Sequence, residues 1–254
     1  MNDLYITTTN EMRYKIIGEG PVVMLLHGWG QNLETFDNLV QGLEGKFILV
    51  DLMGFGMSDE PDYPRNVDDY VKDIEALVDE LKIDKFTLLG HSFGGRVAIK
   101  YASRNYEKLR HLVLVNSAGI KHHDFSFRFK VIKYKIKKAW YKITSKQKLE
   151  KLISSSGSKD YRMASYVMRG TLKRVVKEDL KKAMKQIVVP TTIMAGYYDY
   201  VVSMEDNVLM HKLIKNSKLY VFYKSGHFTY IDEKEKCQRL LKRIIRLGDK
   251  DGNS

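Results

Sequence analysis

The chain has little cysteine and little proline. Its single cysteine, Cys237, excludes an intramolecular disulfide and a metal site built from cysteines. Only four prolines occur in 254 residues, and 44% of the residues are hydrophobic. This composition excludes a disordered or fibrous protein and predicts a globular one. A chain of this length buries enough apolar surface to fold without a disulfide or a structural metal.

Long apolar runs are also missing. No stretch approaches the roughly 18 apolar residues that a membrane-spanning helix requires. The first twenty residues carry five charged side chains and no apolar centre, so they are not expected to act as a signal peptide. The expected location is therefore a reducing cytoplasm.

Positive charge is distributed unevenly. The net charge is +12, but residues 1–120 carry 12 basic and 18 acidic side chains, whereas residues 121–186 carry 20 basic and 5 acidic ones. Residues 187–254 carry 11 basic and 8 acidic side chains. The basic excess thus lies in one segment with its own composition. We interpret residues 121–186 as an insertion into a core domain formed by residues 1–120 and 187–254.

Short apolar runs alternate with helical patterns outside the basic segment. Continuous apolar runs are typical of strands that helices cover on both faces. The sequence has such runs at residues 21–26, 47–50, 86–89, 112–115, 191–195 and 219–222. Between the runs, apolar residues recur every three or four positions, as in residues 67–81 after the helix-capping residue Asn66. These patterns predict an α/β fold with a mostly parallel sheet.

A glycine-rich turn follows the apolar run at residues 86–89. It reads Gly-His-Ser-Phe-Gly-Gly over residues 90–95 and leads directly into a helical pattern. A serine at a sharp strand-to-helix turn needs neighbours with little or no Cβ, which the glycines two positions before and after Ser92 supply. The N-terminus of the following helix directs free N–H groups at the same place. Ser92 is therefore a candidate nucleophile.

Two backbone N–H groups are candidates for binding an oxyanion. Such donors must be in place before negative charge forms on the carbonyl oxygen of a substrate. One is the N–H of Phe93, directly after the serine, and the other is the N–H of Trp29 in the His-Gly-Trp-Gly loop at residues 27–30. His27 is interpreted as a structural residue whose ring nitrogens tie this loop down.

His227 and Asp199 are the predicted partners of the serine. A serine nucleophile needs a base, and the base needs an acid that holds its tautomer. His227 lies in a loop after a late strand, from which it can reach the carboxyl edge of the sheet, and Asp199 follows the run at residues 191–195. The other candidates are interpreted as structural or solvated: His91 (expected to point away from the site), His111, His211, and the cluster of His122, His123 and Asp124. Asp206 and Asp232 are expected to open helices.

These motifs together resemble the α/β-hydrolase family of serine enzymes. The matching stretches are residues 27–30, 51–58, 90–95, 196–199 and 226–228. The resemblance implies an α/β-hydrolase fold, with a mostly parallel central sheet, helices on both faces and an inserted helical lid. It implies the following roles: Ser92 as nucleophile, His227 as base, Asp199 as the acid that orients it, and Trp29 and Phe93 as oxyanion donors.

The resemblance also narrows the family branches. The haloalkane dehalogenase and epoxide hydrolase branches need a carboxylate at position 92, so the serine disfavours them. Some relatives place the acid on the preceding strand, where this chain has Asn116, which leaves Asp199 as the better choice. The turn at residues 51–58 is expected to brace the site and to have no catalytic role.

The basic segment occupies the place where this family commonly has a lid. Its apolar helical stripe is Phe129, Ile132, Ile136, Trp140 and Ile143. The pocket is expected to include Gly28, Trp29, Phe93, Trp140, Val201 and Phe228. The basic side chains are either solvated, or attract an acidic carrier protein or an anionic membrane surface. A nucleic-acid partner is not expected, because no binding motif accompanies the charge.

A partial resemblance to the pimeloyl-acyl-carrier-protein methyl ester esterases rests on the His-Gly-Trp-Gly loop and the basic lid. These esterases usually have tryptophan at the position of His91, and their lid uses arginine where this chain has mostly lysine. The resemblance implies a carrier protein as the partner.

The leading hypothesis is a hydrolase that cleaves a carboxylic ester through an acyl-enzyme, without a metal or another cofactor. Relatives with the same three residues cleave carbon–carbon bonds, eliminate pyruvate or remove N-terminal proline, often from anionic substrates, and this remains an alternative. A binding protein that kept the fold and lost turnover is a third hypothesis, which the complete set of three residues disfavours.

Overall fold

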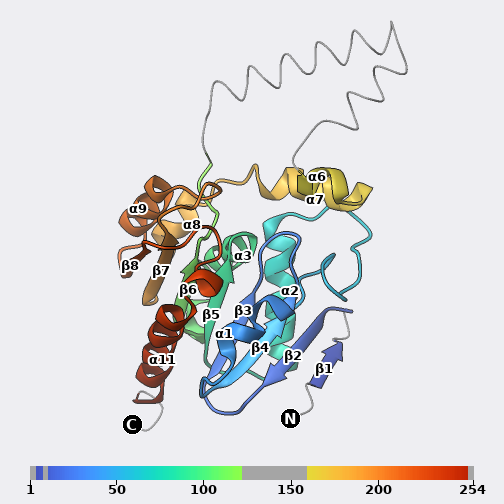
Figure 1. The fold of residues 1–254 in the computed structure, drawn as a ribbon. Coiled ribbons are helices and arrows are strands. Elements are labelled where there is room, and N and C mark those ends of the chain that lie inside the picture. The colour runs from blue at the N-terminus through green and yellow to red at the C-terminus, as the bar shows by residue number, and fades with distance from the viewer. Residues whose placement is uncertain (1–3, 8–10, 122–158, 251–254) are drawn as a thin grey trace, which may run out of the picture.

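The computed structural model describes residues 4–7, 11–121 and 159–250, and an eight-stranded sheet forms their centre (Figure 1). The strands are β1 (Leu4–Thr7), β2 (Arg13–Ile17), β3 (Val22–Leu26), β4 (Lys46–Val50), β5 (Phe86–His91), β6 (Leu109–Val115), β7 (Thr191–Gly196) and β8 (Ser217–Phe222). Their order is β1-β2-β4-β3-β5-β6-β7-β8. Strands β3 to β8 run parallel, whereas β1 and β2 pair antiparallel. The predicted mostly parallel sheet is therefore confirmed.

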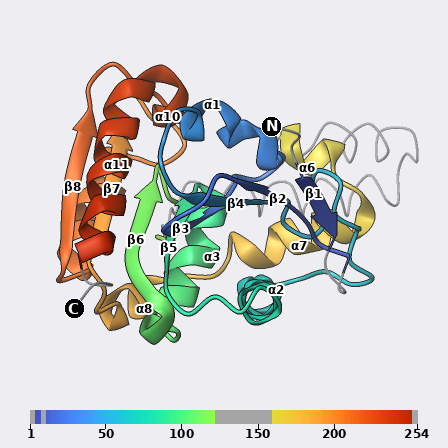
Figure 2. The same cartoon turned by 90° about the horizontal axis from the view of Figure 1, so that it is seen from below.

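Helices cover both faces of the sheet. The described helices are η1 (Leu33–Phe36), α1 (Asp37–Val40), α2 (Val67–Glu80), α3 (Phe93–Ala102), η2 (Tyr106–Lys108), α6 (Lys159–Met163), α7 (Tyr166–Val175), α8 (Lys181–Gln186), α9 (Met204–Leu213), α10 (Thr229–Asp232) and α11 (Lys234–Lys250). Helices α1 and α11 lie on one face, and α2, α3 and α8 lie on the other (Figure 2). The sheet is thus buried on both sides, as its apolar strands require.

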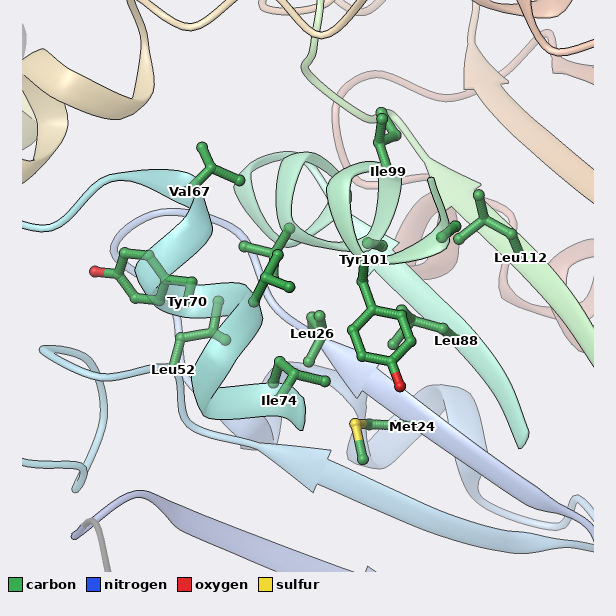
Figure 3. Close-up of a cluster of buried hydrophobic side chains, with 14 of the residues drawn as sticks. Met24, Leu26, Leu52, Val67, Tyr70, Ile74, Leu88, Ile99, Tyr101 and Leu112 are labelled. Carbon is green, nitrogen blue, oxygen red and sulfur yellow. The ribbon is translucent and has the colours of Figure 1, made fainter. Parts of the chain in front are cut away.

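Each parallel strand contributes to two separate cores because successive side chains point to opposite faces. In β3, Met24 and Leu26 pack against α2 and α3, whereas Val23 and Leu25 pack against α1 and α11. Figure 3 shows the first of these cores, where Tyr101 of α3 lies beside the side chains of the central strands. Both cores are closed to solvent, so the ends of the strands are rigidly placed.

Two helix starts follow the expected capping chemistry. Asn66 accepts a hydrogen bond from the N–H of Asp69, and the Asp69 side chain accepts one from the N–H of Asn66, which completes a capping box. Ser203 caps α9 by accepting a hydrogen bond from the N–H of Asp206. The prediction that Asp206 lies at a helix N-terminus is confirmed.

Other predictions need correction. Asp232 does not open the last helix, because it ends the short helix α10 and accepts a hydrogen bond from the N–H of Gly226 (2.8 Å). The strands β1 and β2 were not expected, since they lack a continuous apolar run: β2 includes Lys15, which is buried and bound to Asp37. No helix in the described ranges is long and apolar enough to cross a membrane.

The basic segment is described only in its second half. Helices α6 and α7 lie above the end of the sheet from which the chain leaves β6 (Figure 1). Helix α7 is joined to the core where the N–H of Arg65 donates to the hydroxyl of Thr171 (2.9 Å). The expected apolar stripe, including Trp140, and the cluster at His122, His123 and Asp124 lie outside the described residues.

Candidate active site

Ser92 lies at a strained turn between β5 and α3. Its backbone has φ 50° and ψ −107°, a conformation that residues with a side chain rarely adopt. The turn closes tightly, because a Cβ added at Gly94 would lie 2.2 Å from the carbonyl oxygen of Leu26. The glycines therefore let the backbone of the turn pass close to the end of β3, and the serine is held at the carboxyl edge of the sheet.

The structure brings Ser92, His227 and Asp199 together in one hydrogen-bonded row. His227 Nε2 lies 3.0 Å from Ser92 Oγ, and His227 Nδ1 lies 2.8 Å from Asp199 Oδ2. Because a carboxylate accepts, Nδ1 carries the proton and donates it, and Nε2 is free to accept the hydroxyl proton of the serine. This is the arrangement that a general base needs in order to activate a serine.

Asp199 is held as a buried carboxylate. Its side chain is fully buried, and its Oδ1 accepts hydrogen bonds from the N–H groups of Val201 (2.7 Å) and Val202 (3.0 Å). Burial alone would raise the pKa of Asp199, but the hydrogen bonds from His227, Val202 and Val201 outweigh it and lower the pKa below its ordinary value. Asp199 therefore stays ionised and accepts from His227 near neutral pH.

Asn116 is a site residue to which the sequence assigned no role. It follows β6, has φ 46°, and is fully buried. Its Nδ2 donates to Asp199 Oδ2 (2.8 Å) and to the carbonyl of Gly226 (3.1 Å), while its Oδ1 accepts from the hydroxyl of Thr229 (2.9 Å). Asn116 thus joins the acid to the loop that carries His227. Asn116 stands where some relatives place the acid, and this was a signal that could have pointed to the contact with Asp199.

Trp29 and Phe93, the two residues expected to supply the oxyanion donors, lie side by side. Their rings are in edge-to-face contact, with centroids 5.3 Å apart, and Phe93 is the first residue of α3. In the part of the chain that the structure describes, neither backbone N–H donates to a protein acceptor. Phe55 completes the aromatic cluster at 4.8 Å from Trp29, a contact that the sequence patterns did not indicate.

His27 has the structural role that its sequence context predicts. Its Nε2 accepts from the N–H of Leu52 (3.1 Å), so the proton lies on Nδ1, which donates to the carbonyl of Gly28 (2.8 Å). Burial lowers the pKa of His27 to about 4, which keeps the ring neutral. The loop at residues 27–30 is thereby tied to the turn at residues 51–58, where Asp51 binds the N–H groups of Leu33 and Met57.

The expectation that His91 points away from the site is wrong. His91 is 1% exposed, and its ring centroid lies 4.9 Å from that of His227. Its Nε2 is 2.9 Å from the carbonyl oxygen of His227, and its Nδ1 is 2.9 Å from Oε1 of Gln31. Burial and the nearby His227 lower the pKa of His91 to about 3. The inward direction follows from the tertiary packing, because Tyr230 and Phe228 enclose the ring.

The remaining expected pocket residues differ in position. Gly28 is buried, and its N–H donates to Gln31 (2.9 Å). Phe228 is 38% exposed and packs against His227 at 5.3 Å between ring centroids. Val201 exposes 70% of its surface and contributes its N–H to Asp199, whereas Trp140 lies outside the described residues.

His111 and His211 each bind a nearby hydroxyl, of Thr192 and Ser217 respectively. Among the described residues, no group of three His, Cys, Asp or Glu side chains is placed to hold a metal ion.

Comparison with known proteins gives a consistent picture. Residues 21–142 match a protein-family model described as alpha/beta hydrolase fold. The AB hydrolase superfamily protein YisY of Bacillus subtilis is 29% identical over 249 residues, which cover 90% of this chain and 92% of that protein. A pimeloyl-[acyl-carrier protein] methyl ester esterase of Legionella pneumophila is 24% identical over 90% of this chain and 97% of that protein.

A solved structure shows the same fold. The meta-cleavage product hydrolase of Pseudomonas fluorescens superposes with a TM-score of 0.71 at 22% sequence identity, over 93% of this chain and 94% of that one. The similarity therefore extends through nearly the whole chain, and the fold expected from the sequence motifs is confirmed.

Proposed function

Because this chain belongs to the α/β-hydrolase family and is a hydrolase, we propose that it cleaves carboxylic esters with Ser92 as the nucleophile. The observation that carries the proposal is the hydrogen-bonded row of Asp199, His227 and Ser92, in which each proton and each acceptor has the direction that acyl transfer needs. The similarity to an esterase over 90% of the chain supports the choice of an ester.

In the first half of the reaction, His227 Nε2 accepts the hydroxyl proton while Ser92 Oγ attacks the ester carbonyl. The resulting imidazolium is stabilised by Asp199, which is already ionised and directly bound to Nδ1. The N–H groups of Trp29 and Phe93 are the donors for the carbonyl oxygen as it becomes negative, and each such donor is typically worth about 3 kcal/mol in the transition state. His227 then gives the proton to the leaving alcohol, and an acyl-serine remains.

The second half repeats these steps with water. His227 takes a proton from water, the hydroxide attacks the acyl carbon, and the same two N–H groups stabilise the second oxyanion. The proton returns to Ser92 Oγ as the ester bond to the serine breaks, and the free acid leaves. The strained turn places Ser92 opposite the base, with Oγ 3.0 Å from His227 Nε2, so the reacting groups are already close together.

The test is covalent labelling combined with ester turnover. We expect a fluorophosphonate probe to label Ser92, as located by peptide mass mapping, and p-nitrophenyl esters of C2 to C12 acids to be hydrolysed with one chain-length optimum. Ser92→Ala should lose labelling and retain less than a few per cent of the activity. The matched control is Ser103→Ala at the far end of α3, where the hydroxyl donates to the carbonyl of Lys100. Activity retained by Ser92→Ala would overturn the proposal.

Labelling without ester turnover would keep the nucleophile and change the reaction. The substrate would then be sought among anionic acids with a cleavable carbon–carbon bond, or among peptides with N-terminal proline. The structural likeness to a meta-cleavage product hydrolase makes the first of these the next panel to assay.

A further inference from the structure

We infer that His91 is a positioning residue that holds the backbone of His227 in register with Ser92. The inference rests on the proposed function, since the group that His91 positions is the proposed base. His91 precedes Ser92 directly and ends β5, where its backbone pairs with Val115 of β6, so its Cα is held by the central sheet.

The ring of His91 fills the space between the loop after β3, which carries Gln31, and the loop after β8, which carries His227. On one side it contacts the rings of His227 and Phe228, at 4.9 and 5.4 Å between centroids. Tyr230 contacts the ring as well, at 5.0 Å between centroids. Within this enclosure the ring is 1% exposed, so water cannot replace its hydrogen bonds.

Both ring nitrogens face oxygen atoms that accept. The partner of Nε2 is the backbone carbonyl of His227, and the partner of Nδ1 is Oε1 of Gln31, each at 2.9 Å. The same Oε1 accepts from the N–H of Gly28 (2.9 Å), which can only donate, so this atom is the amide oxygen.

Gln31 is held at its other end as well. Its Nε2 donates to the hydroxyls of Thr35 (3.0 Å) and Tyr230 (3.1 Å). The side chain thus has one orientation, in which Oε1 faces Nδ1 of His91.

The number of protons on the His91 ring decides which of its two contacts is a hydrogen bond. A neutral imidazole has one N–H, and the burial that lowers the pKa of His91 to about 3 keeps the ring neutral. The ring therefore donates either from Nε2 to His227 or from Nδ1 to Gln31, and not to both at once. Because the His227 ring must stay between Asp199 and Ser92, the tautomer protonated on Nε2 is the one that holds the base in place.

This assignment is tested with substitutions that imitate one nitrogen at a time. Glutamine places its amide N–H₂ near the position of Nε2, asparagine places its own near Nδ1, and alanine removes both. We expect His91→Ala to lower kcat roughly 10- to 100-fold with KM changed less than about twofold, because misplacing a catalytic group by about 1 Å costs up to about 100-fold in rate. His91→Gln should recover most of kcat, and His91→Asn should resemble the alanine variant.

A spectroscopic measurement makes the test independent of turnover. The proton between His227 Nδ1 and Asp199 Oδ2 should give a low-field ¹H NMR resonance in the wild type and in His91→Gln, and this resonance should be lost or shifted in His91→Ala. The matched control is His111→Gln on β6, whose ring binds the hydroxyl of Thr192 and lies outside the site. It should leave both kcat and the resonance unchanged.

The outcomes are distinguishable from failure of the proposed function. A wild type without probe labelling and ester turnover would overturn the proposed function. An active wild type with His91→Ala unchanged in kcat and resonance would overturn only the role of His91. Equal losses in the alanine and glutamine variants, with unchanged thermal unfolding, would also contradict the Nε2 assignment.

Discussion

Asn116 and His227 bind the same oxygen atom of Asp199. Asn116 Nδ2 and His227 Nδ1 each lie 2.8 Å from Oδ2, so a neutral donor directly after β6 and the proposed base share one carboxylate oxygen. The amide of Asn116 satisfies Asp199 without a charge of its own. A second carboxyl group at position 116 would instead compete with Asp199 for a proton shared between the two.

Asn116→Asp should therefore shift the activity toward alkaline pH. The change places a second buried carboxylate within hydrogen-bonding distance of Asp199, and two such groups cannot both ionise easily, so their pair retains a proton to higher pH. We expect kcat/KM for the best p-nitrophenyl ester to fall roughly tenfold or more at pH 6 and to recover toward pH 9.

The control is Asn116→Ala, which removes the donor and adds no charge. It should reduce kcat/KM by a similar factor at every pH. A pH profile of Asn116→Asp that runs parallel to the wild-type profile would show that the two side chains do not interact as the geometry indicates.

Gly94→Ala should prevent the turn around Ser92 from closing. The added Cβ would lie 2.2 Å from the carbonyl oxygen of Leu26 and 2.7 Å from that of His27, and backbone atoms of a central strand cannot move aside. We expect a loss of about 3 kcal/mol or more in the free energy of unfolding, or no folded protein. Gly226→Ala is the matched control, because its nearest atom, the carbonyl oxygen of Tyr198, is 3.7 Å away. It should stay within about 1 kcal/mol of the wild type in urea denaturation. A Gly94→Ala protein as stable as the control would contradict the close packing of the turn.

The free energy of unfolding should decrease as the pH falls from 7 to 5. Burial lowers the pKa values of His27 and His111 to about 4 and that of His91 to about 3, so below about pH 6.5 the unfolded chain binds protons that the folded chain does not. Each histidine then costs roughly 1 kcal/mol per pH unit. Asp73 has the opposite effect on the free energy of unfolding. Burial raises its pKa to about 6, so as the pH falls the folded state takes up this proton at a higher pH than the unfolded state.

Urea denaturation at several pH values measures this balance. The effect of three buried histidines exceeds that of one buried carboxyl group, so the wild type should lose stability between pH 7 and pH 5. Most of the lost stability should return when the pH is brought back to 7. His111→Gln removes one of the three histidines and should lose less. An unfolding free energy that is equal at pH 7 and pH 5 would contradict the neutral, buried state of these rings.

The described part of the basic segment should attract an anionic surface. Between Tyr161 and Lys177 the chain has five basic residues and no acidic one, and Met163 and Tyr166 expose 76% and 89% of their surfaces. We expect co-sedimentation with vesicles that contain anionic lipid at low salt, and release at about 0.5 M salt, where screening shortens the range of such charges. Lys173→Glu with Lys177→Glu should weaken binding more than Lys212→Glu with Lys215→Glu. Equal binding to neutral and anionic vesicles would exclude the electrostatic attraction.

Much of the fold could be predicted because its signals are local. The apolar runs at residues 86–89 and 191–195 lie within β5 and β7, and the capping residue Asn66 begins the helix that it was expected to begin. Strand β2 escaped this reasoning, since the buried Lys15 interrupts its pattern and is compensated by Asp37, which lies 22 positions later in the chain. A charge pair of this kind has no local signature.

The sequence by itself determined the parallel strands of the sheet, the turn at Ser92 and the short set of histidines and acids that could serve it, because apolar periodicity and glycine spacing act over a few residues. Only the tertiary structure decided which of these groups meet. His227 reaches Ser92 across 135 positions, and Asn116 reaches Asp199 across 83, because parallel strands end at one edge of the sheet. The direction of the His91 ring was decided in the same way: its partners come from the loops after β3 and β8, and burial among them leaves the ring no other acceptors.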